Sequence, residues 1–149
     1  MPRLLSRFPA VLSGCLAFAG ISTAWAASPL DAYAWEARPL LIFASSESAP
    51  TLRRQLEVLR PHQDELLERE VPVIVVTEAA VRMNGQDAPL SAAALRSRYR
   101  IGADEFAILL IGKDTGVKLR ERETVRPSRI FDLIDSMPMR QQEMRRRSN

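Results

Sequence analysis

Hydrophobic residues recur along this chain in two patterns, short continuous runs and repeats at helical spacing, and the two kinds of segment alternate. Three runs, residues 40–44, 71–77 and 106–112, are uninterrupted by charge. Their length and their branched or aromatic residues predict strands that are buried on both faces. A fourth segment, residues 117–121, alternates in character, which favours an exposed edge strand.

The segment between the first two runs predicts a long helix over residues 51–68. Its leucines fall within one apolar stripe at helical spacing: Leu52, Leu56, Leu59, Leu66 and Leu67. Ser48 or Thr51 is the expected N-cap, because a short hydroxyl side chain can accept a hydrogen bond from the first helical turn. Pro61 has no N–H group and should kink the helix within its length.

Two shorter helices are expected later in the chain. One spans residues 91–99, with Ser91 as its N-cap, and is rich in alanine and arginine. The other spans residues 127–137, starts at Pro127 and ends before Pro138. One face of this last helix holds Ile130, Phe131, Ile134 and Met137.

Two turns carry glycine signals. Asn84-Gly85 is the strongest two-residue hairpin signal, so residues 78–89 are expected to form a small flap or a plain loop. Between the last two strands, residues 113–116 are expected to form a turn in which Gly116 suits a positive φ.

The elements therefore follow the order strand, helix, strand, helix, strand, strand, helix, which indicates an α/β domain. This order resembles the thioredoxin-like core, βαβ-α-ββ-α, a four-stranded central sheet flanked by helices. Residues 108–118, Ile-Leu-Leu-Ile-Gly-Lys-Asp-Thr-Gly-Val-Lys, resemble the strand–turn–strand of peroxiredoxins and thioredoxins. The resemblance implies a thioredoxin-like domain over residues 39–138.

A fuller pattern is similar to that of a family of small exported bacterial proteins of unknown function. In that pattern a Leu-Leu-Ile-Phe-Ala strand precedes an arginine-rich helix, as at residues 40–44 here. Ile-Gly-Lys-Asp-x-Gly-Val-Lys-Leu-Arg then precedes a helix that ends in Met-Pro, as at residues 111–120 and 137–138. A related domain occurs in animal extracellular-matrix proteins with sushi repeats. The resemblance covers roughly residues 39–145 and implies a fold without an established activity.

The chain departs from redox-active thioredoxins at the two places that carry their chemistry. Those proteins have Cys-x-x-Cys after the first strand, whereas residues 45–51 of this chain contain no cysteine. Those proteins also keep a cis-proline where this chain has Glu105-Phe106-Ala107. Serine cannot replace thiolate in disulfide exchange, because the reaction needs a sulfur nucleophile. The sequence supports no catalytic constellation, so a binding protein is expected in preference to an enzyme.

Residues 1–27 have the three parts of a secretory signal peptide. Arg3 and Arg7 give a positive start, an uncharged apolar stretch follows, and Ala-Trp-Ala ending at Ala26 offers a cleavage point. Cleavage there predicts a periplasmic or secreted protein whose mature part has no cysteine, since Cys15 is the only one in the chain. The alternative is a lipoprotein, in which Leu-Ser-Gly-Cys serves as a lipobox and Cys15 is lipidated.

The rest of the chain is expected to comprise a lead-in over residues 28–38, the domain over residues 39–138 and a basic tail over residues 139–149. Tyr33 and Trp35 are the expected anchors of the lead-in. Residues 28–139 carry 15 basic and 17 acidic side chains, a balance that argues against nucleic-acid binding.

Three groups of exposed polar residues are candidate surfaces for a ligand or partner: Ser45, Ser46 and Ser48; Lys118, Arg120 and Arg122; and Arg145, Arg146 and Arg147. The serines follow the first strand, where this fold places its active site, although turn formation and helix capping also explain them. The cations of the edge strand could dock an acidic partner, or they could protect that edge from aggregation. The tail arginines could contact an anionic membrane, but a solvated, frayed terminus is the simpler interpretation.

The sequence predicts no cofactor and no metal site. His62 is the only histidine, and it is expected to be half-buried at the helix kink, because one imidazole does not build a zinc site. The predicted function is a non-catalytic binding or accessory module for an unidentified protein partner or small ligand. The alternative is a peroxiredoxin-like or oxidoreductase-linked protein that acts with a redox partner.

Overall fold

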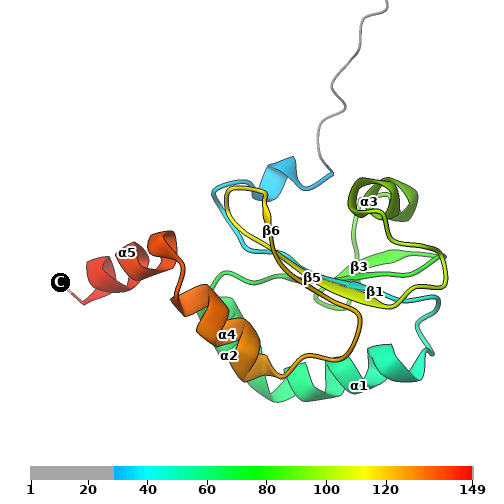
Figure 1. The fold of residues 1–149 in the computed structure, drawn as a ribbon, viewed down its shortest axis with the longest axis horizontal. Coiled ribbons are helices and arrows are strands. Elements are labelled where there is room, and N and C mark those ends of the chain that lie inside the picture. Colours follow the sequence, from blue (N-terminus) through cyan, green and yellow to red (C-terminus); the bar gives the residue numbers. More distant parts are fainter. Residues whose placement is uncertain (1–28, 149) are drawn as a thin grey trace, which may run out of the picture.

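The computed structural model describes residues 29–148, which are built around one six-stranded sheet (Figure 1). The strands are β1 (Leu40–Phe43), β2 (Val73–Val76), β3 (Val81–Met83), β4 (Gln86–Asp87), β5 (Ala107–Ile111) and β6 (Val117–Glu121). They lie in the order β4-β3-β2-β1-β5-β6, with β1 and β2 parallel and the other neighbouring pairs antiparallel. The predicted thioredoxin-like α/β fold is confirmed, and the sheet has six strands where four were expected.

The expected signal peptide, with Cys15 and the cleavage point at Ala26, lies outside the described residues. Both the signal peptide and the alternative lipid anchor therefore stay predictions. Within residues 29–148, no helix is long and apolar enough to cross a membrane.

The described residues hold five α-helices and two short 3-10 helices. They are η1 (Asp31–Tyr33), α1 (Pro50–Leu59), η2 (Arg60–His62), α2 (Gln63–Glu68), α3 (Ala92–Tyr99), α4 (Pro127–Asp135) and α5 (Pro138–Arg147). Figure 1 shows α1, α2 and α4 on one face of the sheet and α3 on the other, while α5 extends outward from the end of α4. The sheet is therefore covered on both sides, as its uncharged strands predicted.

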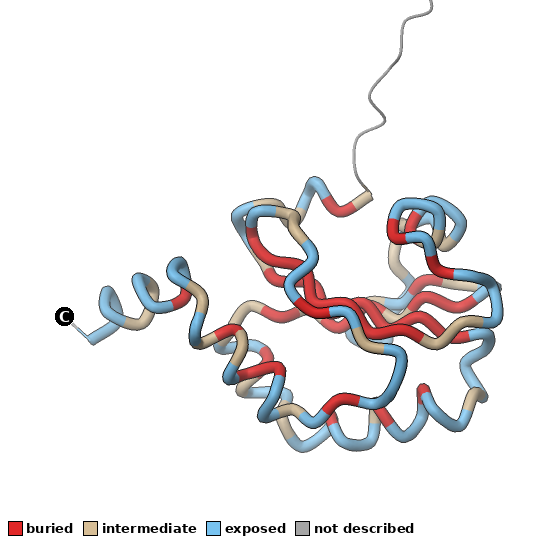
Figure 2. Tube along the Cα trace, in the orientation of Figure 1, coloured by how far each residue is buried: buried red, intermediate tan, exposed pale blue. Residues whose placement is uncertain are grey.

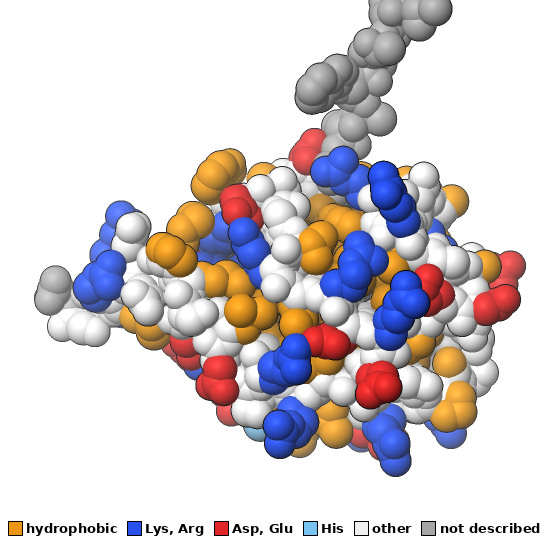
Figure 3. Space-filling model, in the orientation of Figure 1, with side chains coloured by type: hydrophobic (Ala, Val, Ile, Leu, Met, Phe, Trp, Pro, Cys, Tyr) orange, Lys and Arg blue, Asp and Glu red, His pale blue; other side chains and the backbone are white. Residues whose placement is uncertain are grey.

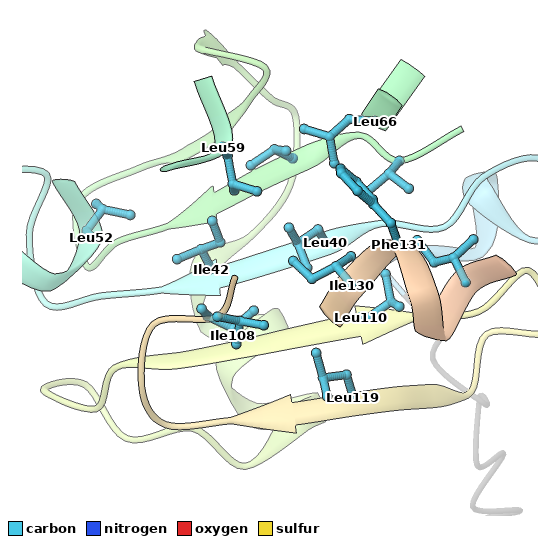
Figure 4. Packing of buried hydrophobic residues seen from close by; sticks show 14 of the residues in the cluster. Leu40, Ile42, Leu52, Leu59, Leu66, Ile108, Leu110, Leu119, Ile130 and Phe131 are labelled. Carbon is cyan, nitrogen blue, oxygen red and sulfur yellow. The ribbon is translucent and has the colours of Figure 1, made fainter. Parts of the chain in front are cut away.

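The alternating side chains of β1 divide the interior into two clusters. Leu40 and Ile42 pack with the helices on the α1 side, whereas Leu41 and Phe43 pack with those on the α3 side. Figure 4 shows the first cluster, whose helical members include Leu52, Leu59, Leu66, Ile130 and Phe131. Burial is concentrated in the central strands (Figure 2), so these clusters are the main source of stability.

The predicted long helix is interrupted by η2 at Pro61, which confirms the expected kink. Its N-cap was wrongly predicted: the N-cap residue is Ala49, without a side-chain hydrogen bond, and Pro50 fixes the first turn instead. Leu67 was also wrongly placed in the buried stripe, because its side chain is 78% exposed. Leu66 follows Leu59 by seven residues, about two helical turns, and stays on the buried face, whereas Leu67 is one residue further around the helix and faces outward.

Asn84 and Gly85 form the two-residue turn of the β3–β4 hairpin, as predicted. Their φ angles are 50° and 84°, and positive φ at both central residues is the feature of a type I′ turn. The side-chain oxygen of Asn84 accepts a hydrogen bond from the backbone N–H of Val73 at 3.0 Å. The hairpin therefore extends the sheet beside β2 rather than forming a detached flap.

The turn between β5 and β6 has its left-handed residue at Thr115, with φ 64°, and not at Gly116 as expected. The carboxylate of Asp114 accepts a hydrogen bond from the N–H of Gly116 and forms an ion pair with Lys118. These two contacts hold the turn together. A Cβ atom at Gly112 would lie against the side chains of Lys118 and Asp114, so a larger residue there would require these two side chains to move.

Of the two expected anchors of the lead-in, Tyr33 packs against the body and Trp35 does not, and Leu30 and Arg38 are further anchors. Leu30 and Arg38 are each only 1% exposed, and Tyr33 is half-buried with its hydroxyl 3.2 Å from the sulfur of Met83. Trp35, an expected anchor, is instead 66% exposed and has a positive φ of 65°. Its backbone N–H donates to the carbonyl of Lys113 at 2.7 Å, so the backbone of Trp35 is held while its indole faces solvent.

The basic tail is helical rather than frayed. Helix α4 ends at Asp135, and α5 starts at Pro138, since a proline is well tolerated in the first turn of a helix. Arg145, Arg146 and Arg147 are exposed on this helix, whereas Arg140 is buried. The end of the described chain is attached to the body through Arg140, Glu143 and Arg147, whose side chains bind charged residues outside α5.

Candidate functional site

The serine-containing loop between β1 and α1 lies where the sequence placed it, at the carboxyl end of β1. Ser45, Ser46 and Ser48 are exposed, and the hydroxyl oxygens of Ser46 and Ser48 are 3.1 Å apart. Within residues 29–148, no hydrogen bond joins these serines to a histidine or a carboxylate. A serine nucleophile needs such a base, so this loop supports no nucleophilic catalysis.

Arg96 of α3 lies beside this loop and binds backbone carbonyl groups at the end of the sheet. The arginine content of α3 is evident from the sequence, but this role is not. Its guanidinium donates to the carbonyl oxygen of Ala44 at 2.6 Å and of Val76 at 3.4 Å, and also to that of Gly102. It lies 5.6 Å from the ring centre of Phe43. Arg96 thus satisfies the carbonyl groups where β1 and β2 end, and this end of the sheet is closed by the chain itself.

Lys118 and Arg120 of β6, and Arg122 directly after it, each have an acceptor within the chain. Lys118 pairs with Asp114 at 2.6 Å, and Arg122 pairs with Glu105 at 3.2 Å. Arg120 donates to the carbonyl oxygen of Tyr99 at 3.0 Å. Figure 3 shows basic side chains gathered over α3 and the strands beside it, with apolar side chains between them. Because the strand cations are already engaged, edge protection explains them better than a free docking surface.

His62 is half-buried at the kink, as expected. Its Nδ1 atom is 3.1 Å from a carboxylate oxygen of Glu65, and its ring packs edge-on against Phe131. The hydrogen bond with His62 holds the pKa of Glu65 below its ordinary value of 4.5, although slight burial opposes this. In the described part of the chain, no three histidine, cysteine or acidic residues are grouped to hold a metal ion.

A pocket of about 350 Å³ lies between α1 and the β2–β3 strands, and we call it the α1–hairpin pocket. Its apolar wall is formed by Leu52, Leu56, Leu59, Val73 and Val75. Its polar rim is formed by Glu47, Arg60, Gln63, Arg82, Asn84 and Gly85. The sequence identified the leucine stripe as core, but part of that stripe remains accessible because α1 does not cover the hairpin side of the sheet completely.

The charges on the rim are unevenly paired. Arg82 lies 3.1 Å from a carboxylate oxygen of Glu47 and 3.3 Å from one of Asp87. Arg60 lies at the other side of the rim and forms no ion pair with any residue in 29–148. One feature of the sequence could have indicated that Arg60 lies at the rim: Pro61, directly after it, interrupts the helix there.

A second group of charged residues lies at the opposite end of the sheet, and we call it the basal ion cluster. Its members are Arg38, Lys113, Arg69, Arg140, Glu68, Glu70, Asp135 and Glu143. Arg38 and Lys113 bind one oxygen of Glu143 at 2.9 and 2.8 Å. Arg140 binds Glu68 at 2.5 Å and Asp135 at 3.1 Å. The cluster therefore fixes α5 to the start of β1 and to the end of α2.

The carboxylates of this cluster have depressed pKa values. The hydrogen bond from Arg140 lowers the pKa of Glu68 below 4.5. Burial alone would raise the pKa of Asp135, but hydrogen bonds from Arg69 and Arg140 hold it below 3.8. Burial alone would also raise the pKa of Glu143, but hydrogen bonds from Arg38 and Lys113 hold it below 4.5.

Acid is therefore expected to destabilise the fold through this cluster. Because the folded-state pKa values lie below the ordinary ones, the unfolded chain binds more protons in acid, and stability falls as pH decreases. The contribution is complete above the ordinary values of 4.5 and 3.8 and is lost as pH falls below them. Thermal unfolding followed by circular dichroism at pH 7, 5, 4 and 3 should show a midpoint that decreases progressively below pH 5. A midpoint as high at pH 3 as at pH 7 would contradict this.

Comparisons with known proteins agree with this geometry. A family model described as "Domain of unknown function (DUF4174)" matches residues 29–143. No curated protein matches the chain. The structure is similar to the reduced 2-Cys peroxiredoxin of Plasmodium vivax, with a TM-score of 0.58 and 15% sequence identity over 76% of this chain and 84% of that one. At this identity the likeness concerns the fold alone.

Proposed function

Because the chain belongs to the family described as domain of unknown function DUF4174, with a thioredoxin-like fold, we propose that it is a non-catalytic binding module. The observation that carries the proposal is the α1–hairpin pocket, a concavity beside the sheet in which Leu56 and Val75 are partly exposed. Its ligand is a small molecule with an apolar part. In agreement with the N-terminal residues, we place this activity in the periplasm or outside the cell.

The absence of thiol chemistry supports binding over catalysis. The only cysteine of the chain is Cys15, which lies outside the matched family region and outside the described residues. Disulfide exchange needs a thiolate, and the loop of Ser45 to Ser48 has no sulfur atom; its one carboxylate, Glu47, is paired with Arg82 and is not hydrogen-bonded to the hydroxyl groups. The reaction familiar for this fold therefore has no nucleophile in residues 29–148.

The shape of the pocket also supports binding. Ligand pockets are typically concave and mostly apolar, occupy about 300–1,000 Å³ and carry a few polar groups that orient the ligand. The α1–hairpin pocket has these properties, with a volume of about 350 Å³ at the small end of that range. Action beside a redox partner is a second candidate function, favoured by the fold that the chain shares with a peroxiredoxin.

A neutral apolar fluorophore, N-phenyl-1-naphthylamine, tests whether the pocket binds ligands. The wild-type protein should give a saturable rise in fluorescence, and Leu56→Gln should weaken binding at least tenfold by making the pocket wall polar. Leu67→Gln is the matched control, because Leu67 is 78% exposed and lies outside the pocket. It should bind the fluorophore like wild type.

Circular dichroism of both variants separates loss of the pocket from loss of the fold. A second variant, Gln63→Trp, obstructs the pocket from an exposed helical position and should also reduce binding. No saturable binding by folded wild-type protein would overturn the proposal, as would equal binding by wild type and both pocket variants.

A further inference from the structure

Arg60 gives the α1–hairpin pocket a charge that its rim does not balance. Leu52, Leu56, Leu59, Arg60 and Gln63 lie along one side of the helical segment and all line the pocket. The 3-10 turn at Pro61 makes Arg60 the residue at which this wall changes from apolar to polar. Its guanidinium is exposed at the rim, with no acidic partner among the described residues.

The other charges of the rim oppose one another. Glu47 is engaged by Arg82 at 3.1 Å, and Arg82 also faces Asp87 at 3.3 Å. Among the residues that line the pocket, the carboxylate of Glu47 is therefore offset by Arg82, and Asp87, the second partner of Arg82, does not line it. Arg60 remains the cation whose pairing is open to a ligand.

Two neutral amides on the rim add hydrogen-bond donors. Gln63 follows Arg60 by three residues, a spacing that places the two side chains beside each other on a helix. Asn84 uses its side-chain oxygen for the N–H of Val73, while its amide nitrogen has no hydrogen-bond partner within residues 29–148. The guanidinium of Arg60 and the NH₂ groups of Gln63 and Asn84 are donors, which suits a ligand group that accepts hydrogen bonds and carries negative charge.

We infer that the α1–hairpin pocket takes a small amphipathic carboxylate, with its apolar body against the leucine and valine wall and its carboxylate at Arg60. This inference rests on the proposed binding function and names the class of ligand. An arginine guanidinium binds a carboxylate better than a lysine ammonium group would, because the planar guanidinium donors match the two carboxylate oxygens. The volume of about 350 Å³ restricts the ligand to a short chain or a single ring system.

Displacement of bound N-phenyl-1-naphthylamine tests the preference for a carboxylate. Three competitors share one apolar chain and differ in their head group: octanoate, octanamide and octylammonium. At low salt and pH 7.5, octanoate should displace the fluorophore at about a fivefold lower concentration than octanamide, and octylammonium should be the weakest. The preference should decrease in 0.5 M NaCl, because an exposed ion pair is screened by salt.

Arg60→Gln should bind the fluorophore like wild type but lose the preference for octanoate over octanamide. Arg54→Gln is the matched control, an exposed arginine of the same helix that does not line this pocket, and it should keep the preference. Equal displacement by octanoate and octanamide, or a preference that survives Arg60→Gln, would overturn the inference and leave the binding function intact. Failure of wild type to bind the fluorophore at all would overturn both.

Discussion

Arg140→Ala is expected to destabilise the protein by about 3 kcal/mol, because removing one partner from a buried ion cluster leaves the others uncompensated. The arginine side chain is 1% exposed and joins Glu68 of α2 to Asp135 of α4. Its two acceptors are 49% and 31% exposed and can be rehydrated, so the loss should lie at the lower end of the range for buried pairs. The substitution also removes the packing of the arginine stem.

Urea denaturation of the Arg140→Ala variant measures this loss directly. Arg146→Ala is the matched control, because Arg146 is an exposed arginine of the same helix, and it should change stability by no more than about 0.5 kcal/mol. The Arg140→Ala variant should also show a weaker decrease of stability in acid, since Glu68 and Asp135 would lose the partner that depresses their pKa values. Equal stability of the two variants would show that the cluster contributes little.

Gln55→Ala is expected to cost about 3 kcal/mol, because it leaves two buried backbone groups without hydrogen bonds. The side chain of Gln55 is fully buried in α1. Its position lies on the buried leucine stripe, where an apolar residue would be expected. Its amide nitrogen donates to the carbonyl oxygen of Val125 at 3.0 Å, and its oxygen accepts from the N–H of Val125 at 2.7 Å. This pair fixes the segment that leads from β6 into α4 against α1.

Thermal and urea unfolding of the Gln55→Ala variant should show the loss in both midpoints. Gln142→Ala serves as the control, since Gln142 is exposed on α5 and makes no hydrogen bond through its side chain within residues 29–148. Gln55→Glu adds a discriminating variant, because a carboxylate can still accept from the N–H of Val125 but cannot donate to its carbonyl group. If both substitutions at position 55 were tolerated without loss, the buried amide pair would not stabilise this junction.

The two charged regions of the molecule have different roles. The basal ion cluster lies where β1 and β2 begin, since Arg38 precedes β1 and Glu70 precedes β2. Its cations are engaged by carboxylates of the chain, which is the arrangement of a structural contact. In the α1–hairpin pocket, Arg60 has no ion pair among residues 29–148 and part of the apolar wall is exposed, which fits the binding role proposed for it.

Most elements of the fold follow from local sequence patterns, because periodicity and turn chemistry act over a few residues. The uncharged runs became β1, β2 and β5, the alternating run became the edge strand β6, and Asn84-Gly85 formed the expected hairpin turn. Ser91 caps α3 through a hydrogen bond from the N–H of Ala94, and Pro61 interrupts the long helix. The apolar face of α4, with Ile130, Phe131 and Ile134, is buried as its spacing indicated.

Which polar residues are buried, and where the pocket lies, depends on packing between segments that are far apart in the sequence. Gln55, Arg38 and Arg140 are buried because their partners come from distant segments, such as Glu143, which is 105 residues beyond Arg38. Local patterns cannot show such pairs, since a charged residue is ordinarily exposed unless a partner compensates its desolvation. The pocket likewise depends on how far α1 covers the sheet beside the β3–β4 hairpin. This coverage results from packing between segments that are distant in the sequence.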